Sequence, residues 1–439
     1  MQLQYEDLDL SKQQIIEIIN GMGRSLSPLA QEMRRILVAE TETMHIDDSY
    51  MNCLEWQRDD EGNRIRRNCH IWGMTTYARA EKKGAVYLAS KSRSTEDFLM
   101  QFGLTKQGDK EVILPCGIKN IVSDGCSSHP AGIDKIEKLS NRTILRAGCY
   151  AHLRRYFLNA LIDLKLLQVF EAASKGDIES FEERVDAELA ERGINVGPYG
   201  RKVLTACHMI EIIFLLEQDF AYTSREELEE RRKQYTARYV DKLFAIIEEL
   251  KDASKFITVS GERRGVTQYK GGDVYAWGKA VVYALNNKAE LHAFLQCGDV
   301  ECSNNCAERA LRPAKFHSRS MEFLATQTGF QAFADLMTIV STCKLNGVNP
   351  YQYVHWAFAN AKIRVESYRL ANCRTKQICF LPTPQKDKDG NTIGLYDPEF
   401  ETPFDEIDWT GLDVWSYIKL RKEEAPRIKA EMSSEDSDN

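Results

Sequence analysis

The segment Ile121-Val122-Ser123-Asp124-Gly125 decides the fold class predicted for this chain, because an apolar run ends there on an aspartate and a glycine. This arrangement is common at the carboxyl end of a β-strand. Working outward, the apolar patterns predict earlier strands at 44–46, 70–74 and 85–88, and a later one at 143–147. Helices are predicted at 94–102, after a cap at Ser94, and at 133–139. The order β-β-β-α-β-α-β indicates an α/β fold.

Downstream of this region the apolar residues change to a helical period. Long amphipathic segments at 156–173, 203–216 and 235–250 predict a helical block, and two further helices are predicted at 304–316 and 330–343. The predicted organisation is an N-terminal helical segment (1–42), the first part of the α/β core (43–154), an all-α insertion (155–300), the rest of the core (301–372) and a C-terminal extension with a disordered end (373–439).

Composition limits the class of protein. The 439 residues are 43% apolar and 28% charged, which fits roughly two or three globular domains. No apolar run approaches the roughly 20 residues of a membrane helix, and the acidic N-terminus does not resemble an export signal, so we expect a cytoplasmic protein without a membrane partner. Twelve cysteines without a Cys-x-x-Cys pair predict reduced thiols; for Cys297, Cys302 and Cys306, burial is favoured over zinc binding. A net charge of −7 argues against indiscriminate coating of nucleic acid but leaves room for local DNA grooves.

Two aspartates, Asp47 and Asp124, follow apolar strand residues. Carboxylates at strand ends suit a two-metal phosphoryl-transfer site, because a rigid sheet can hold hard oxygen ligands around two Mg²⁺ ions. Taken alone, each aspartate is more often a turn or cap residue.

A third acid, Glu308, has an equally strong structural interpretation. Asn305 with Glu308 three residues later matches a capping box, in which the glutamate binds a backbone amide. A cap does not explain the basic residues that follow at helical spacing, whose face could contact phosphates. These residues are Arg309, Arg312, Lys315 and Arg319.

Several blocks together resemble one known family, the transposases of the insertion-sequence-66 group, which belong to the Asp-Asp-Glu superfamily with a ribonuclease-H-like core. The most specific match is the run of Asn304-Asn305, Glu308-Arg309 and Leu311-Arg312-Pro313. The other matching blocks are Ala280 to Leu285, Thr342 to Tyr351, Asp124-Gly125 and Gly148 to Phe157. The resemblance spans roughly residues 8 to 360, and the family's upstream helical and cysteine-rich region is expected to be absent.

The resemblance implies a ribonuclease-H-like mixed sheet with a large all-α insertion before the last catalytic helix. It implies Asp47, Asp124 and Glu308 as the catalytic, metal-binding acids, with two Mg²⁺ or Mn²⁺ ions. The first acid rests on the family's register, since Asp47-Asp48-Ser49 stands where Asp-Glu-Thr is usual; other departures are Cys126 and His129, where aromatic residues are usual.

Other residues receive supporting roles. Cys149 and His152 are expected to brace the active-site strand, with metal binding by His152 as the less favoured alternative, and Asn305 is expected to support the site. For Arg154 and Arg155, phosphate contact and a solvated face remain open alternatives.

The expected function is metal-dependent cleavage and strand transfer of an insertion sequence. Its expected partners are the element's DNA ends and target DNA, with a homo-oligomer on DNA and helper proteins of the same element. Two alternatives remain: an inactive or truncated DNA-binding relative, and a structure-selective nuclease of the same fold.

Overall fold

The fold is described from a computed structural model of the chain. It covers residues 12–55, 69–107, 110–125, 128–175, 178–221, 223–321, 326–360 and 407–423, with the short strands at 362–363, 385–386 and 392–394. The predicted disordered end lies outside these residues. In the described part of the chain, no helix is both long enough and apolar enough to cross a membrane.

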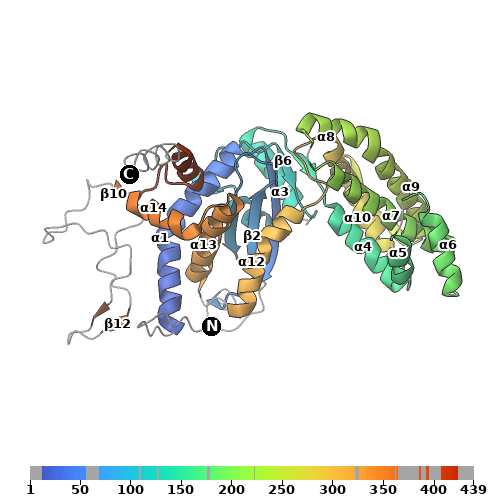
Figure 1. Cartoon of the computed structure of the whole chain (residues 1–439), viewed down its shortest axis with the longest axis horizontal. Coiled ribbons are helices and arrows are strands. Elements are labelled where there is room, and N and C mark those ends of the chain that lie inside the picture. Colours follow the sequence, from blue (N-terminus) through green and yellow to red (C-terminus); the bar gives the residue numbers. More distant parts are fainter. Residues whose placement is uncertain are drawn as a thin grey trace, which may run out of the picture.

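A mixed five-stranded sheet with the order β3-β2-β1-β6-β7 forms the centre of the molecule (Figure 1). Strands β1, β2 and β3 are antiparallel neighbours, whereas β1, β6 and β7 run parallel. All five strands occur where the sequence predicted them, and their order along the chain is the predicted one. Their bounds are β1 (Thr43–Met51), β2 (Cys69–Thr76), β3 (Ala85–Ser90), β6 (Asn120–Val122) and β7 (Leu145–Ala147).

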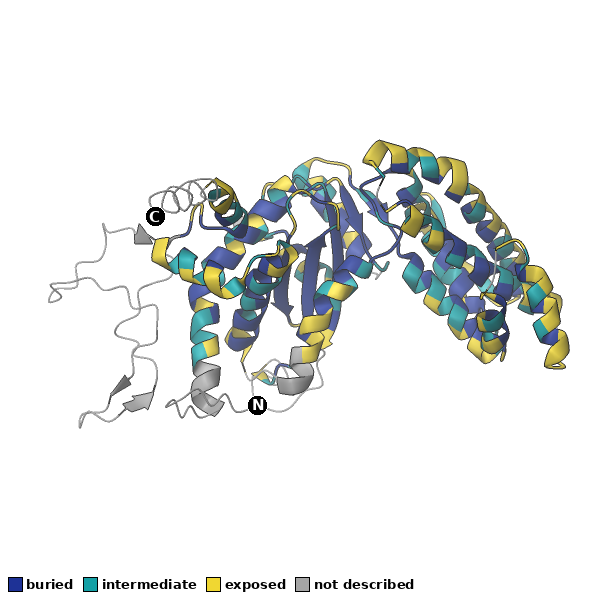
Figure 2. Cartoon of the chain, viewed as in Figure 1, coloured by how far each residue is buried: buried dark blue, intermediate teal, exposed yellow. Residues whose placement is uncertain are grey.

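Both faces of the sheet are covered, so its strands are buried almost throughout (Figure 2). One face packs Ile46, Trp72 and neighbouring apolar residues against α2 (Thr95–Met100), α3 (Ser128–Ser140) and the end of α1 (Lys12–Glu40). The other packs Ile71 and Tyr87 against α12 (Asn305–Met321) and α13 (Gln327–Leu345). Because side chains alternate along a strand, neighbours on β1 face different helices. The predicted cap of α2 is confirmed, since the Ser94 hydroxyl accepts a hydrogen bond from Asp97 N.

The edge strand β3 is covered by side chains of α13. The Thr342 hydroxyl accepts a hydrogen bond from Ala85 N (3.2 Å), lies 3.1 Å from Ala85 O, and Thr338 accepts one from Tyr87 N. Unpaired backbone groups on an edge strand would otherwise be open to another chain. The block Thr342 to Tyr351, recognised in the sequence, therefore begins with a residue that covers this edge strand.

The block between β7 and α12 is mainly helical and extends to one side of the sheet (Figure 1). Its helices share one apolar core with Val122 and Ala147 of the sheet. The helices are α4 (Tyr150–Asp163), α5 (Leu167–Ala173), α6 (Phe181–Glu191), α7 (Pro198–Asp219), α8 (Arg225–Arg231), α9 (Ala237–Ala253), α10 (Gly278–Asn286) and α11 (Lys288–His292), with a π-helical turn (Arg232–Thr236) and a 3-10 turn (Ala293–Gln296).

The prediction that this block is all-α was wrong. Strands β8 (Ile257–Arg263) and β9 (Val266–Gly271) form an antiparallel hairpin inside it. Arg264 and Gly265 connect the strands with φ of 51° and 76°, the backbone conformation of a tight two-residue hairpin turn. A second short hairpin that was not predicted joins β4 (Thr105–Gln107) to β5 (Lys110–Val112).

The C-terminal part returns to the sheet domain. Trp409, Val414 and Tyr417 pack with α1, α13 and α14 (Pro350–Asn360) in one apolar cluster. The remaining short strands pair as β10 (Lys362–Ile363) with β13 (Ile407–Asp408), and β11 (Gln385–Lys386) with β12 (Thr392–Gly394).

Candidate active site

The three predicted acids come from three elements that meet at the centre of the sheet. Asp47 lies within β1, Asp124 lies just beyond the parallel strand β6, and Glu308 lies in the first turn of α12. Burial raises the pKa of Asp47 to about 7, and the carboxylates of Asp124 and Glu308 add to this rise. Asp47 is 8% exposed. The structure therefore brings the three carboxylates into one electrostatic neighbourhood.

Asp48 faces the opposite side of the sheet and is neutralised there. Its carboxylate lies 2.6 Å from His70 Nδ1 and 2.6 Å from Arg93 Nη2. Burial alone would raise the pKa of Asp48, but these two partners outweigh it and lower the pKa. Of the two adjacent aspartates, Asp47 is the one whose pKa the carboxylates of Asp124 and Glu308 raise.

Asp124 has two neighbours that sequence reasoning missed. His129 Nδ1 lies 3.3 Å from one carboxylate oxygen, and Arg93 Nη2 lies 4.0 Å from the other. His129 is buried against Trp72 and Phe98, and this burial lowers its pKa. The only sequence signal for His129 was its departure from the family pattern, and Arg93 gave none.

Glu308 does not form the capping box that was its alternative interpretation. Helix α12 begins at Asn305, so the flanking residue is Asn304, whose carbonyl accepts the Glu308 backbone N–H at 3.2 Å. Within the described residues, Glu308 Oε1 accepts no hydrogen bond. This oxygen instead lies 3.7 Å from His152 Nδ1 and 3.6 Å from Arg155 Nη2.

The Cys149–His152 pair adjoins the third acid. Ligand atoms of Cys149, His152 and Glu308 lie within 4.8 Å of one another. Burial raises the pKa of the Cys149 thiol to about 11 and lowers that of His152. In the described residues His152 Nδ1 makes no hydrogen bond, so it is available to a ligand beside Glu308.

The predicted basic residues divide into distinct groups. Arg154 forms an ion pair with Glu211 of α7, whereas Arg155 is 58% exposed beside Glu308. Arg309, Arg312 and Lys315 are exposed on α12, while the side chain of Arg319 lies outside the described residues.

Asn304, rather than the predicted Asn305, joins the elements of the site. It is fully buried; its side-chain amide donates to Ile46 O (2.9 Å) and its backbone N–H points to Cys149 Sγ (3.1 Å). Asn305 is half-buried at the first helical position, and no side-chain hydrogen bond is found for it within the described residues. The paired asparagines signalled this site, but the helix starts one residue earlier than the capping-box interpretation assumed, so Asn304 is the cap residue and Asn305 the first helical residue.

Tyr283 belongs to the block Ala280 to Leu285 that was recognised in the sequence. Its hydroxyl lies 3.2 Å from Asp124 O and 3.3 Å from Cys149 O, so α10 contacts the backbone of the second acid.

A comparison with known protein families identifies the family of this chain. A family profile described as "Transposase IS66 family" matches residues 1–332. The chain belongs to the IS66 family of transposases. This finding confirms the resemblance recognised from the motifs.

Three curated relatives are uncharacterized proteins of Sinorhizobium fredii (strain NBRC 101917 / NGR234). Protein y4qI is 27% identical over 49% of this chain and 30% of its own length. Protein y4jD is 22% identical over 68% of this chain and 47% of its own length. Protein y4hP is 37% identical over 16% of this chain and 12% of its own length. The IS66-family chain thus matches less than half the length of each relative.

The raised pKa of Asp47 predicts a pH-dependent stability in metal-free buffer. The pKa of Asp47 in the folded protein (about 7) exceeds the ordinary value of 3.8. The protonated Asp47 side chain therefore contributes to the stability of the fold fully below about pH 4, and this contribution is lost as pH rises through 7. The penalty at pH 8 is on the order of 4 kcal/mol. Asp47→Asn should therefore gain unfolding free energy over the wild type as pH rises from 4 to 8, measured by urea denaturation in EDTA.

Asp48→Asn is the matched control for this measurement. Its pKa is lowered in the fold, so the substitution should lose stability relative to the wild type as pH rises. If the difference in unfolding free energy between the wild type and Asp47→Asn does not change with pH, the raised pKa of the buried Asp47 carboxylate is contradicted.

The role of Asn304 predicts unequal effects at the two asparagines. Asn304→Ala leaves the buried carbonyl of Ile46 without this donor and should lower the unfolding free energy by about 1–3 kcal/mol. Asn305→Ala should change it by less than about 0.5 kcal/mol. Urea denaturation of both variants checks this, and equal losses would contradict the assignment to Asn304.

Proposed function

We propose that this IS66-family protein is a DNA transposase that cleaves and joins strands by metal-dependent phosphoryl transfer, with Asp47, Asp124 and Glu308 as its catalytic acids. The observation that carries the proposal is the buried Asp47 carboxylate, whose pKa two further acids raise. Family membership supports DNA as the substrate. The sheet order, with three antiparallel strands followed by two parallel ones, supports a ribonuclease-H-like core.

The donor set fits divalent cations. Like-charged carboxylates in a partly buried site repel one another, and a cation held between them relieves that repulsion. Hard carboxylate oxygens favour Mg²⁺ or Mn²⁺. When bound, two such ions would activate a water or 3′-hydroxyl nucleophile and stabilise the leaving oxygen.

The protein's own residues hold and orient the acids. Asp48 keeps Arg93 beside Asp124, and His129 approaches the same carboxylate from the apolar side. On the opposite side, Arg155 carries an exposed guanidinium next to Glu308. A guanidinium at that point can bind a phosphate of the DNA backbone and place the strand against the acids.

A cavity beside α12 supports DNA binding on that side of the site. It has a volume of about 390 Å³ and is lined by Lys83, Arg309 and Lys344, together with threonine, serine and tyrosine hydroxyls. No carboxylate is found among its described lining residues. Cations and hydroxyls are the groups that contact DNA phosphates without reading sequence.

Replacing Glu308 separates catalysis from folding. Glu308→Gln keeps the size of the side chain but removes the charge that would hold a metal, so strand cleavage and transfer should fall by orders of magnitude. The assay uses the full chain and DNA carrying the element's ends, with Mg²⁺ or Mn²⁺; Ca²⁺ should support binding without cleavage. Melting temperature and DNA affinity should stay near those of the wild type.

Glu183→Gln is the matched control, because Glu183 also lies in the first turn of a helix but is exposed on α6. It should cleave normally. Normal cleavage by Glu308→Gln, or activity of the wild type in EDTA, would refute the mechanism. If the wild type binds DNA without cleaving it, the protein is an inactive DNA-binding relative. If it cleaves branched DNA but does not join strands, it is a structure-selective nuclease.

The exposed basic residues of α12 should affect the affinity for DNA but not the cleavage chemistry. Arg312→Ala or Lys315→Ala should weaken DNA binding to a similar extent on all sequences and reduce the slope of log K against log salt by about one. Arg201→Ala, which removes a guanidinium paired with Asp186 in the helical block, should leave the slope unchanged. Fluorescence anisotropy at several salt concentrations measures the DNA affinity and its salt slope for each variant. An unchanged slope for Arg312→Ala would exclude a phosphate contact there.

A further inference from the structure

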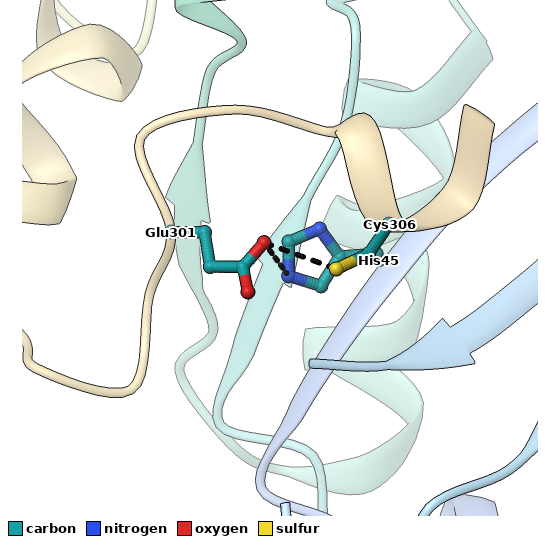
Figure 3. Close-up of side chains that lie close together, drawn as sticks. All are labelled: His45, Glu301 and Cys306. Atoms are coloured by element: carbon teal, nitrogen blue, oxygen red, sulfur yellow. Dashed lines mark hydrogen bonds and ion pairs between the residues drawn. The ribbon is translucent and has the colours of Figure 1, made fainter. Parts of the chain in front are cut away.

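A second group of potential ligands lies next to the acids but does not include them. Three side chains point toward one another here: His45 of β1, Glu301 of the loop before α12, and Cys306 of α12 (Figure 3). Their ligand atoms lie within 4.8 Å. Glu301 and Cys306 are five residues apart, whereas His45 is more than 250 residues away in the sequence, so the fold brings His45 to the other two.

The distances suit a tetrahedral ion. Cys306 Sγ lies 3.1 Å from Glu301 Oε2, and His45 Nε2 lies 3.8 Å from the same oxygen. Ligand atoms around zinc, with bonds of about 2.0–2.3 Å, are separated by roughly 3.3–3.8 Å. These two distances lie within a few tenths of an ångström of that range, and the third pair of ligand atoms lies within 4.8 Å.

His45 is the observation that points to a ligand. Its side chain is fully buried, and neither ring nitrogen makes a well-formed hydrogen bond within the described residues. Its polar neighbours are Glu301 and the side chain of Asn304. A buried polar group without a partner is costly, and binding a metal ion is one way to satisfy it.

The chemistry of the group selects a different ion from that of the three acids. One thiolate, one imidazole and one carboxylate form a mixed set that zinc binds well, whereas Mg²⁺ and Mn²⁺ prefer oxygen ligands. Arg309 Nη2 donates a hydrogen bond to Cys306 Sγ (3.3 Å). Burial and Glu301 raise the pKa of the Cys306 thiol to about 12, and the Arg309 guanidinium opposes that rise from outside the ligand set.

We propose that His45, Glu301 and Cys306 bind one zinc ion, with water as the fourth ligand. On binding, the Cys306 thiol releases its proton to solvent and its sulfur bonds to the metal. The ion would connect β1, two residues before Asp47, to α12, two residues before Glu308. It would thus hold the first and third acids in register from outside the catalytic group.

The test measures metal content and cobalt spectra of the full chain. The wild type purified from zinc-containing medium should retain about one zinc per chain after dialysis, by mass spectrometry of metals. Replacing the zinc with Co²⁺ should produce a thiolate-to-cobalt charge-transfer band in the near ultraviolet. A wild type with neither zinc nor this band overturns the proposal and leaves a Glu301–Cys306 hydrogen bond only.

Three variants assign the ligands. Cys306→Ser should lose the band and the bound zinc, whereas Cys302→Ser, which changes another buried cysteine nearby, should retain both. Glu308→Gln should also retain both, which separates this site from the catalytic acids. A band that persists in Cys306→Ser, or zinc that is lost in Glu308→Gln, overturns the assignment; the latter would move the ion to Cys149, His152 and Glu308.

Discussion

The hydrogen bond from the Asn304 side chain to Ile46 O is the contact on which the site's geometry depends. It holds the start of α12 against the backbone of β1 directly before Asp47. The backbone N–H of Asn304 reaches Cys149 Sγ at the start of α4, and its carbonyl begins the helix that carries Glu308. One buried side chain therefore sets the relative position of two acids that are distant in sequence. An amide suits this task because it carries donors and an acceptor at full burial without a charge.

The same contact has to resist electrostatic repulsion. Burial and the neighbouring acids raise the pKa of Asp47, so the metal-free site destabilises the fold at neutral pH. The adjacent Asp48 is stabilised instead, because His70 and Arg93 neutralise it on the other face of β1. Two successive aspartates thus have opposite effects on stability, and the alternation of side chains along the strand is the cause. Of these two aspartates, the one that destabilises the metal-free fold is the one proposed to bind metal.

Sequence patterns predicted the sheet because its strands carry a strong local signal of apolar residues between charged turns. They missed the β8–β9 hairpin, since its strands are partly exposed and interrupted by glycines within a helical region. Asp47, Asp124 and Glu308 could be selected from motifs, yet the choice of Asp47 over Asp48 needed the family register. The structure adds that these two residues lie on opposite faces of the strand. Arg93 and His129 could not be selected, because their proximity to Asp124 depends on how α2 and α3 pack on the sheet.

The helical block contributes residues to the site. Helix α4 begins at the residue after Cys149 and carries His152 and Arg155 to Glu308. Helix α10, near the other end of the block, places the Tyr283 hydroxyl between the carbonyls of Asp124 and Cys149. Since both ends of the block contact the acids or their backbone, a shift of its helices would change the distance between Asp124 and Glu308. The insertion therefore supports the site mechanically, and this accounts for the presence of family motifs at Gly148–Phe157 and Ala280–Leu285, outside the strands that carry the aspartates.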